Sequence, residues 1–326
     1  MIKEFFNIMI KYITSHPVYK LLNNTIQSFL NDNALKFSAA LSYYTVFAIA
    51  PLAIIIIAVC GYFYGETEVR SELFNQISDL IGPNAAQQIE TTMQNIDIAG
   101  KNRLAAIVGG ITLLFGASGV FAEIQSSINY IWGFKAKPTK GILRFVVNRL
   151  LSFSMIVSLG FILLVTLILN SALDFIYNNF FKDLFDFSVY VMIVLNNVVI
   201  FIVVSVLFAV IYKVLPGAHI RWKDTAIGAM FTAVLFMLGK YVIGIYLGNT
   251  NIASAYGAAG SVLLILLWVY YSAMILYFGA EFTKEYCKMY GTKILPDKLS
   301  IPIVKYYEVP DDVVKKIVEG TLKTKV

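Results

Sequence analysis

Lys240 is the residue of this 326-residue chain that points most directly to chemistry, because it stands inside an apolar stretch of membrane-span length. The stretch runs from Thr225 to Leu247, so Lys240 lies about 10 Å from its end at 1.5 Å per residue. A lysine at the centre of a membrane helix costs about 2.5–3.5 kcal/mol, and less toward the edge. One interpretation is a cationic site for an anionic group, such as a phosphate or a carboxylate. The alternative is a lysine that extends to the membrane surface or bonds to helix-end carbonyls.

Helical phasing indicates which way Lys240 points. The phase of Lys240 places it near a stripe of small residues made by Thr225, Ala229, Ala233 and Gly244. Small residues allow another helix or a ligand to approach closely. The sequence therefore predicts that Lys240 faces the interior of a helix bundle.

Glu123 is a second charge at the edge of an apolar stretch. Its expected partners are Arg144 and Arg149, near the start of the next stretch, and Lys36, near the start of the first. Glu281, at the end of the last stretch, is expected in the same layer. Two interpretations remain open: a structural ion network, or a carboxylate that couples ions or protons to transport.

The uncharged segment from Asn249 to Ser261 is rich in glycine, alanine and serine. Two interpretations remain open: the segment dips back into the membrane beside Lys240, or it forms a tight outer loop. Non-helical backbone enters a membrane only where protein buries it or where it lines a water-filled cavity. The residues expected to line a path with Lys240 are Tyr43, Tyr44, Asn129, Gly257 and Gly260.

The sequence contains no pattern of residues that is typical of an enzyme active site. The two histidines, His16 and His219, are far apart and lack a metal-ligand spacing, and the isolated Cys60 and Cys287 form no CxxC pair. The sequence contains no HExxH, GxSxG or P-loop motif. We therefore expect no catalytic residue, no metal site, no cofactor and no enzymatic activity.

The composition predicts the kind of structural elements that carry these residues. Hydrophobic residues make up 58% of the chain and charged residues only 14%, whereas soluble domains carry about 25% charged residues. This excludes a soluble enzyme, a disordered chain and a disulfide scaffold, and indicates an all-α, multi-pass membrane protein. Six stretches are long enough to cross as helices: Ala39 to Tyr64, Leu104 to Ile124, Val147 to Asn170, Val189 to Tyr212, Thr225 to Leu247 and Ser261 to Phe282.

The formal net charge of +6 is explained by orientation rather than by a nucleic-acid partner. Of the 26 lysines and arginines, 21 fall before the first stretch, between the second and third, between the fourth and fifth, or after the last, if Arg149 in the first turn of the third stretch is counted with the connection before it. This asymmetry places both termini in the cytoplasm. The lysines of the tail alternate with acids, so they suit a cytoplasmic tail or anionic lipid as well as RNA.

Three regions follow from this organisation. Residues 1–36 are predicted to form amphipathic helices on the inner membrane surface. Residues 37–286 form the six-helix domain, with an outer amphipathic hairpin over residues 65–103 that is broken at Gly82-Pro83-Asn84. Residues 287–326 form a lysine-rich cytoplasmic tail.

Several short motifs resemble those of the YihY/BrkB family of bacterial inner-membrane proteins, once labelled ribonuclease BN-like. They cover most of Phe37 to Tyr286. The clearest are Phe37-Ser38-Ala39-Ala40-Leu41-Ser42-Tyr43-Tyr44, Ile131-Trp132-Gly133, Arg149-Leu150-Leu151-Ser152-Phe153, Leu238-Gly239-Lys240, Ser254-Ala255-Tyr256-Gly257-Ala258-Ala259-Gly260-Ser261 and Phe278-Gly279-Ala280-Glu281-Phe282. The resemblance implies a six-helix protein of the bacterial cytoplasmic membrane, with roles in transport or lipid handling suspected for some members.

The leading hypothesis is a transporter or flippase that moves an anionic or amphiphilic molecule, such as a lipid, with Lys240 binding its charge. Its expected partners are membrane lipids and this substrate, and no nucleic acid. The first alternative is a non-transporting membrane scaffold that recruits partners. A remote alternative is a tRNA-processing ribonuclease, which the missing catalytic motifs disfavour.

Overall fold

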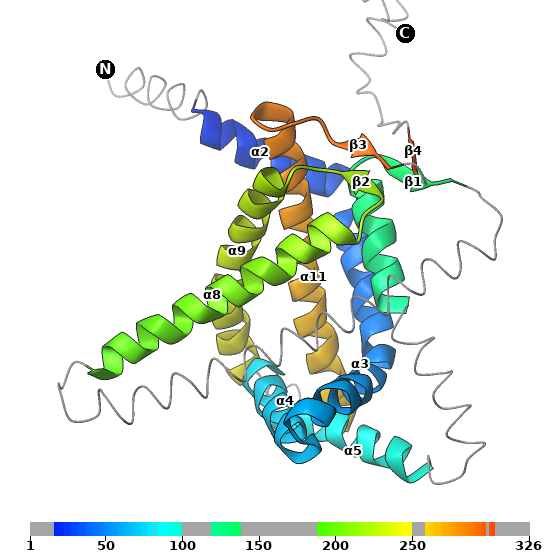
Figure 1. Cartoon of the computed structure of the whole chain (residues 1–326), viewed down its shortest axis with the longest axis vertical. Coiled ribbons are helices and arrows are strands. Elements are labelled where there is room, and N and C mark those ends of the chain that lie inside the picture. The colour runs from blue at the N-terminus through cyan, green and yellow to red at the C-terminus, as the bar shows by residue number, and fades with distance from the viewer. Residues whose placement is uncertain are drawn as a thin grey trace, which may run out of the picture.

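The fold, taken from a computed structural model, is mostly helical, and the described residues are 16–81, 83–99, 119–137, 188–249, 258–297 and 300–303. Long helices run between two ends of the molecule (Figure 1). Helix α2 and all four short strands lie at one end, and helices α4 and α5 lie at the other. The predicted third span, Val147 to Asn170, and the start of the second lie outside the described residues.

Four long helices correspond to predicted spans. They are α3 (Ala34–Tyr64), α8 (Ser188–Val214), α9 (Trp222–Asn249) and α11 (Ala258–Met289). Within the described residues, three helical segments are long and apolar enough to cross a membrane: Val194–Val214, Trp222–Ile243 and Val262–Met289. Residues 119–131 are helical, so the described part of the predicted second span is helix and continues past its expected end at Ile124.

Helix α2 (Pro17–Asn31) precedes the first long helix, and the two meet at a sharp elbow. Pro17 stands at the first position of α2, where its missing N–H costs nothing, and the His16 side chain accepts a bond from the Val18 N–H. At the elbow, Asn33 adopts a left-handed conformation with φ of 55°, which asparagine tolerates better than most residues. The elbow fixes the direction in which α3 leaves α2.

Two helices, α4 (Glu66–Ile81) and α5 (Pro83–Ala99), lie where the sequence predicts an amphipathic hairpin. The break falls where Gly82-Pro83 was expected to interrupt the helix. Val69, Ile89 and Met93 from the hairpin pack with Ile57 and Cys60 of α3 in a small apolar core. The hairpin is therefore packed against the end of the bundle.

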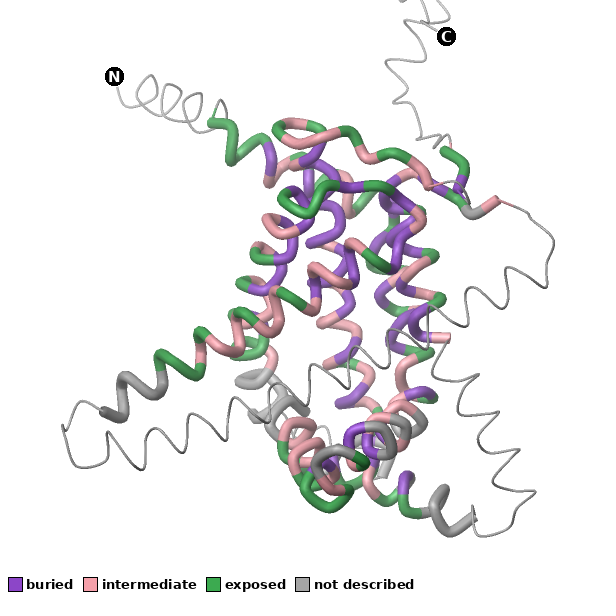
Figure 2. The backbone as a smooth tube through the Cα atoms, in the orientation of Figure 1, coloured by how far each residue is buried: buried purple, intermediate pink, exposed green. Residues whose placement is uncertain are grey.

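A main core joins α3, α8, α9, α11 and residues 119–131, and the buried positions concentrate in these helices (Figure 2). Helices α9 and α11 cross where Gly228 and Thr232 of α9 meet Thr283 and Gly279 of α11. Each glycine faces the threonine of the other helix, so both backbones approach closely. Tyr212 of α8 is fully buried beside this crossing and donates a hydrogen bond to the Leu276 carbonyl at 2.7 Å.

Two short antiparallel strand pairs connect the tail to the loops. Strand β1 (Phe134–Ala136) pairs with β4 (Ser300–Pro302), and β2 (Ala218–His219) pairs with β3 (Leu295–Pro296). The Nε2 atom of His219 also lies 3.2 Å from a carboxylate oxygen of Asp297, at the surface. The start of the lysine-rich tail predicted over residues 287–326 is thus paired with two segments that follow helices.

Candidate functional site

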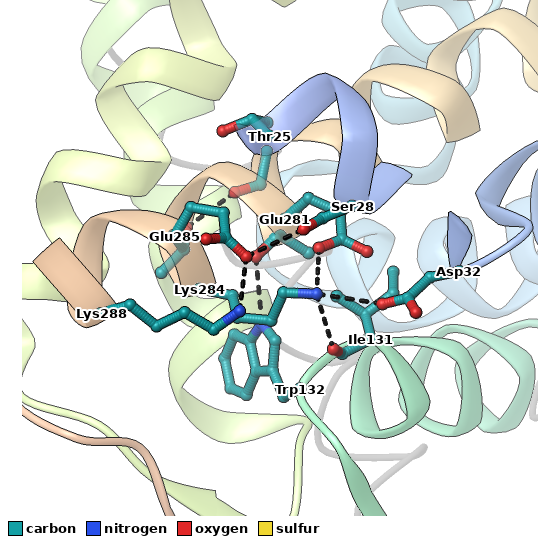
Figure 3. A network of polar contacts seen from close by, with 12 residues as sticks. Thr25, Ser28, Asp32, Ile131, Trp132, Glu281, Lys284, Glu285 and Lys288 are labelled. Carbon is teal, nitrogen blue, oxygen red and sulfur yellow. Dashed lines mark hydrogen bonds and ion pairs between the residues drawn. The ribbon is translucent and has the colours of Figure 1, made fainter. Parts of the chain in front are cut away.

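The strongest concentration of buried charge lies near the α2 end of the bundle (Figure 3). The ammonium group of Lys284, on α11, is 3.0 Å from a carboxylate oxygen of Asp32 and also contacts the carboxylate of Glu281. It donates a third bond to the Ile131 carbonyl at 3.1 Å. The side chains of Asp32 and Glu281 are fully buried, and that of Lys284 is 10% exposed. We call Asp32, Glu281 and Lys284 the charged trio.

Further polar contacts on either side of the charged trio also join α11 to other parts of the chain. The Glu285 carboxylate accepts a bond from the Ser28 hydroxyl at 2.9 Å and pairs with Lys288 at 2.6 Å. The indole N–H of Trp132 donates to the Ala280 carbonyl at 3.1 Å. Because Lys288 is 59% exposed, its pair is solvated, unlike the charged trio.

Three separate parts of the chain position the charged trio. Asp32 comes from the α2–α3 elbow, Ile131 from the end of the helical residues 119–131, and Glu281 and Lys284 from consecutive turns of α11. The attraction within an ion pair is stronger where water is excluded. Two buried carboxylates without their cation would strongly destabilise the fold. The arrangement therefore fixes the elbow to α11.

The charged trio is not the ion network that the sequence predicted around Glu123. Glu281 does belong to the charged trio. Glu123 is only half-buried and accepts a bond from its own helix, from Ser127 at 3.1 Å. Lys36 is exposed and does not pair with Glu123, so that expected pair was wrong. Arg144 and Arg149 lie outside the described residues.

Lys240 does not face the bundle interior, and this prediction is corrected. Its side chain is exposed, although the small residues of its stripe, Thr225, Ala229 and Ala233, are buried as expected. Near its start, α9 buries several residues in each turn, whereas near its far end Gly239 is the buried residue among those described. Lys240 has the phase of the buried stripe, but at its level of α9 it is Gly239 that packs against α11.

The other predicted path residues do not gather around Lys240. Tyr43 and Tyr44 are exposed on α3, with their ring centroids 5.9 Å apart. Asn129 is buried and accepts a bond from the Gly217 N–H at 2.9 Å, which fixes the turn after α8. Gly260 is buried in the first turn of α11, so this end of the expected loop is helix. Gly257 lies outside the described residues.

Sequence reasoning missed Asp32 and Lys284. Lys284 was grouped with the tail lysines, because the last apolar stretch ends at Phe282. The available signal was Glu281-x-x-Lys284, since residues three apart lie on one face of a helix. Within the described ranges, no group of three His, Cys, Asp or Glu side chains is placed to hold a metal ion.

Comparison with known proteins places the chain among membrane proteins. The profile of the family described as Virulence factor BrkB matches residues 25–300. UPF0761 membrane proteins from Psychrobacter sp. (strain PRwf-1) and Stenotrophomonas maltophilia (strain K279a) are each 26% identical, over 82% and 84% of this chain. One from Mannheimia succiniciproducens is 25% identical over 78% of the chain and 85% of its own length.

The chain spans 48% and 62% of the length of the Psychrobacter and Stenotrophomonas relatives. No solved structure matches the chain. The family match is wider than the motifs above, because it also includes Asp32 and the strand at Leu295–Pro296. With its profile matched over most of its length, the chain belongs to the YihY/BrkB family of membrane proteins.

Proposed function

We propose that this protein moves an amphiphilic molecule with an anionic group, such as a lipid, across the bacterial cytoplasmic membrane. In this proposal both termini are cytoplasmic, Lys240 contacts the anionic group, and the protein performs no chemical conversion and needs no cofactor. The observation that carries the proposal is the position of Lys240. It is exposed on an apolar helix and makes no ion pair or hydrogen bond with the described residues.

The exposure of Lys240 changes the kind of substrate that fits. A water-soluble anion requires a hydrated, enclosed path, whereas an amphiphile keeps its chains in the lipid and needs only a polar contact on the membrane-facing surface. Leu238, Tyr241 and Val242, beside Lys240, are large, largely apolar and exposed. These surroundings favour an amphiphile over a small soluble anion.

Flux in liposomes tests the proposal. Full-length protein in vesicles should accelerate the exchange of a fluorescent anionic phospholipid between leaflets, measured by reduction of the fluorophore from outside. Lys240→Ala should slow the exchange about tenfold, equivalent to about 1.4 kcal/mol of lost interaction.

The matched control is Lys223→Ala, which removes another exposed lysine of α9 near its start. It should leave the exchange rate unchanged. If the wild-type protein moves neither lipids nor organic anions, or if Lys240→Ala moves them equally well, the transport proposal fails. Absence of all movement would favour the non-transporting scaffold.

A further inference from the structure

Helix α8 presents an apolar strip that the described protein leaves uncovered. Its members recur every four residues, on one side of the helix, and are 47–60% exposed: Val194, Val198, Ile202 and Val206. Figure 2 shows α8 with little buried surface over the part farthest from the strands. In a membrane, such a strip contacts lipid chains or another apolar surface.

A polar spot lies beside this strip, away from the end that carries α2. The Tyr241 hydroxyl of α9 is 3.5 Å from the Asn197 carboxamide oxygen of α8. Asn196 and Lys240 are the exposed neighbours of these two residues in sequence. Two antiparallel helices therefore bring a cation, two carboxamides and a phenol to the same depth.

The dimensions of the surface fit an amphiphile. From Asn197 to Val206 the helix rises about 14 Å at 1.5 Å per residue. Half of a hydrocarbon core about 30 Å thick is about 15 Å. The part of the strip from Val198 to Val206, which begins beside Asn197, is thus about as long as the acyl region of one leaflet is deep, and Val194 lies one turn beyond the polar spot.

We propose that the α8–α9 surface binds a phospholipid with a net negative headgroup, which enters sideways from the membrane. The headgroup phosphate contacts Lys240 and the carboxamides of Asn196 and Asn197, and one acyl chain lies along the strip from Val198 to Val206. This inference deepens the proposed function and rests on it for its meaning, because it names the substrate class and the direction of entry.

Charge and desolvation together select this ligand. Lys240 supplies a positive charge that no described residue neutralises. A free anion at this place would lose hydration beside the apolar side chains of Leu238 and Val242 without any apolar contact in return. A phospholipid keeps its acyl chains in an apolar environment throughout, because the strip replaces neighbouring lipid chains, and its phosphate gains the contact with Lys240.

Photo-crosslinking tests the site without requiring transport. The full chain in nanodiscs is exposed to phosphatidylglycerol or phosphatidylcholine carrying a photoactivatable acyl chain, and the labelled peptides are mapped. Phosphatidylglycerol should label residues 194–206 at least fivefold more than phosphatidylcholine. Lys240→Ala and Lys240→Glu should abolish this preference, whereas Lys240→Arg and the control Lys223→Ala should retain it.

Other outcomes overturn the inference. Equal labelling by both lipids, or a preference that survives Lys240→Glu, would show that Lys240 merely reaches the membrane surface. Suppression of the labelling by soluble glycerol phosphate would indicate a site for a free anion. Selective labelling without leaflet exchange would reject the transport proposal alone, and exchange without selective labelling would reject only this site.

Discussion

Replacing Lys284 with alanine is expected to lower the free energy of unfolding by about 3–5 kcal/mol, because it removes the cation shared by two fully buried carboxylates. The Asp32 and Glu281 carboxyl groups also interact with each other, so without Lys284 two acidic groups would be left in contact in the core. The loss should appear as a lower unfolding midpoint of the full chain in detergent, titrated with dodecyl sulfate and followed by circular dichroism.

The chain contains a matched control for this substitution. Lys288 pairs with Glu285 at the same spacing, one turn further along α11, but its side chain is 59% exposed. Lys288→Ala should cost no more than about 1 kcal/mol, as expected for a solvated pair. Similar losses for the two variants would contradict the view that burial makes the charged trio important.

A double variant distinguishes two causes of the loss: the missing attraction of the Lys284 ammonium, and the buried Glu281 carboxylate that is left without a cation. Glu281→Gln removes the carboxylate that Lys284→Met leaves without its cation, so the combination should be more stable than Lys284→Met alone. If the two losses simply add, the Lys284–Glu281 contact does not carry the effect.

The long helices could be predicted because their signal is local. The apolar runs behind α8 and α9 match the helices to within three residues at each end. Helix α11 extends seven residues beyond Phe282, to Met289. The prediction stopped early because Lys284 and Glu285 look like a polar terminus, whereas in the fold their charges are paired and buried.

The site was less predictable, because its partners are distant in sequence. Asp32 and Lys284 are 252 residues apart, so no periodicity links them. For Lys240 the helical phase matched the buried stripe nearer the start of α9, but at its own level Gly239 packs against α11, a change that periodicity within one helix cannot show. Strands of two or three residues, such as β2 and β4, carry no alternating pattern and depend on the helices that bring them together.

The crossing of α9 and α11 carries the second large effect, and Gly279→Ala tests it. A methyl group added at Gly279 would overlap the hydroxyl oxygens of Thr232 and Tyr212. Both hydroxyls are engaged, since Thr232 donates to the Gly228 carbonyl at 2.7 Å and Tyr212 to the Leu276 carbonyl at 2.7 Å. Overpacking costs about 1–3 kcal/mol and a lost hydrogen bond about 1 kcal/mol, so we expect a loss of about 2–4 kcal/mol.

Gly119→Ala is the control, because among the described residues the nearest atom to its added methyl group would be on Tyr44, at 3.8 Å. It should be neutral or stabilise the helix by up to about 1 kcal/mol. Adding Thr232→Gly to Gly279→Ala removes one of the overlapping hydroxyls and should restore part of the loss, measured by the same dodecyl sulfate titration.

Because Gly228 faces Thr283 in the same way, Gly228→Ala should be destabilising and partly rescued by Thr283→Gly. Destabilisation by both glycine variants without rescue by either partner would show that close packing of these two residue pairs is not what joins α9 to α11.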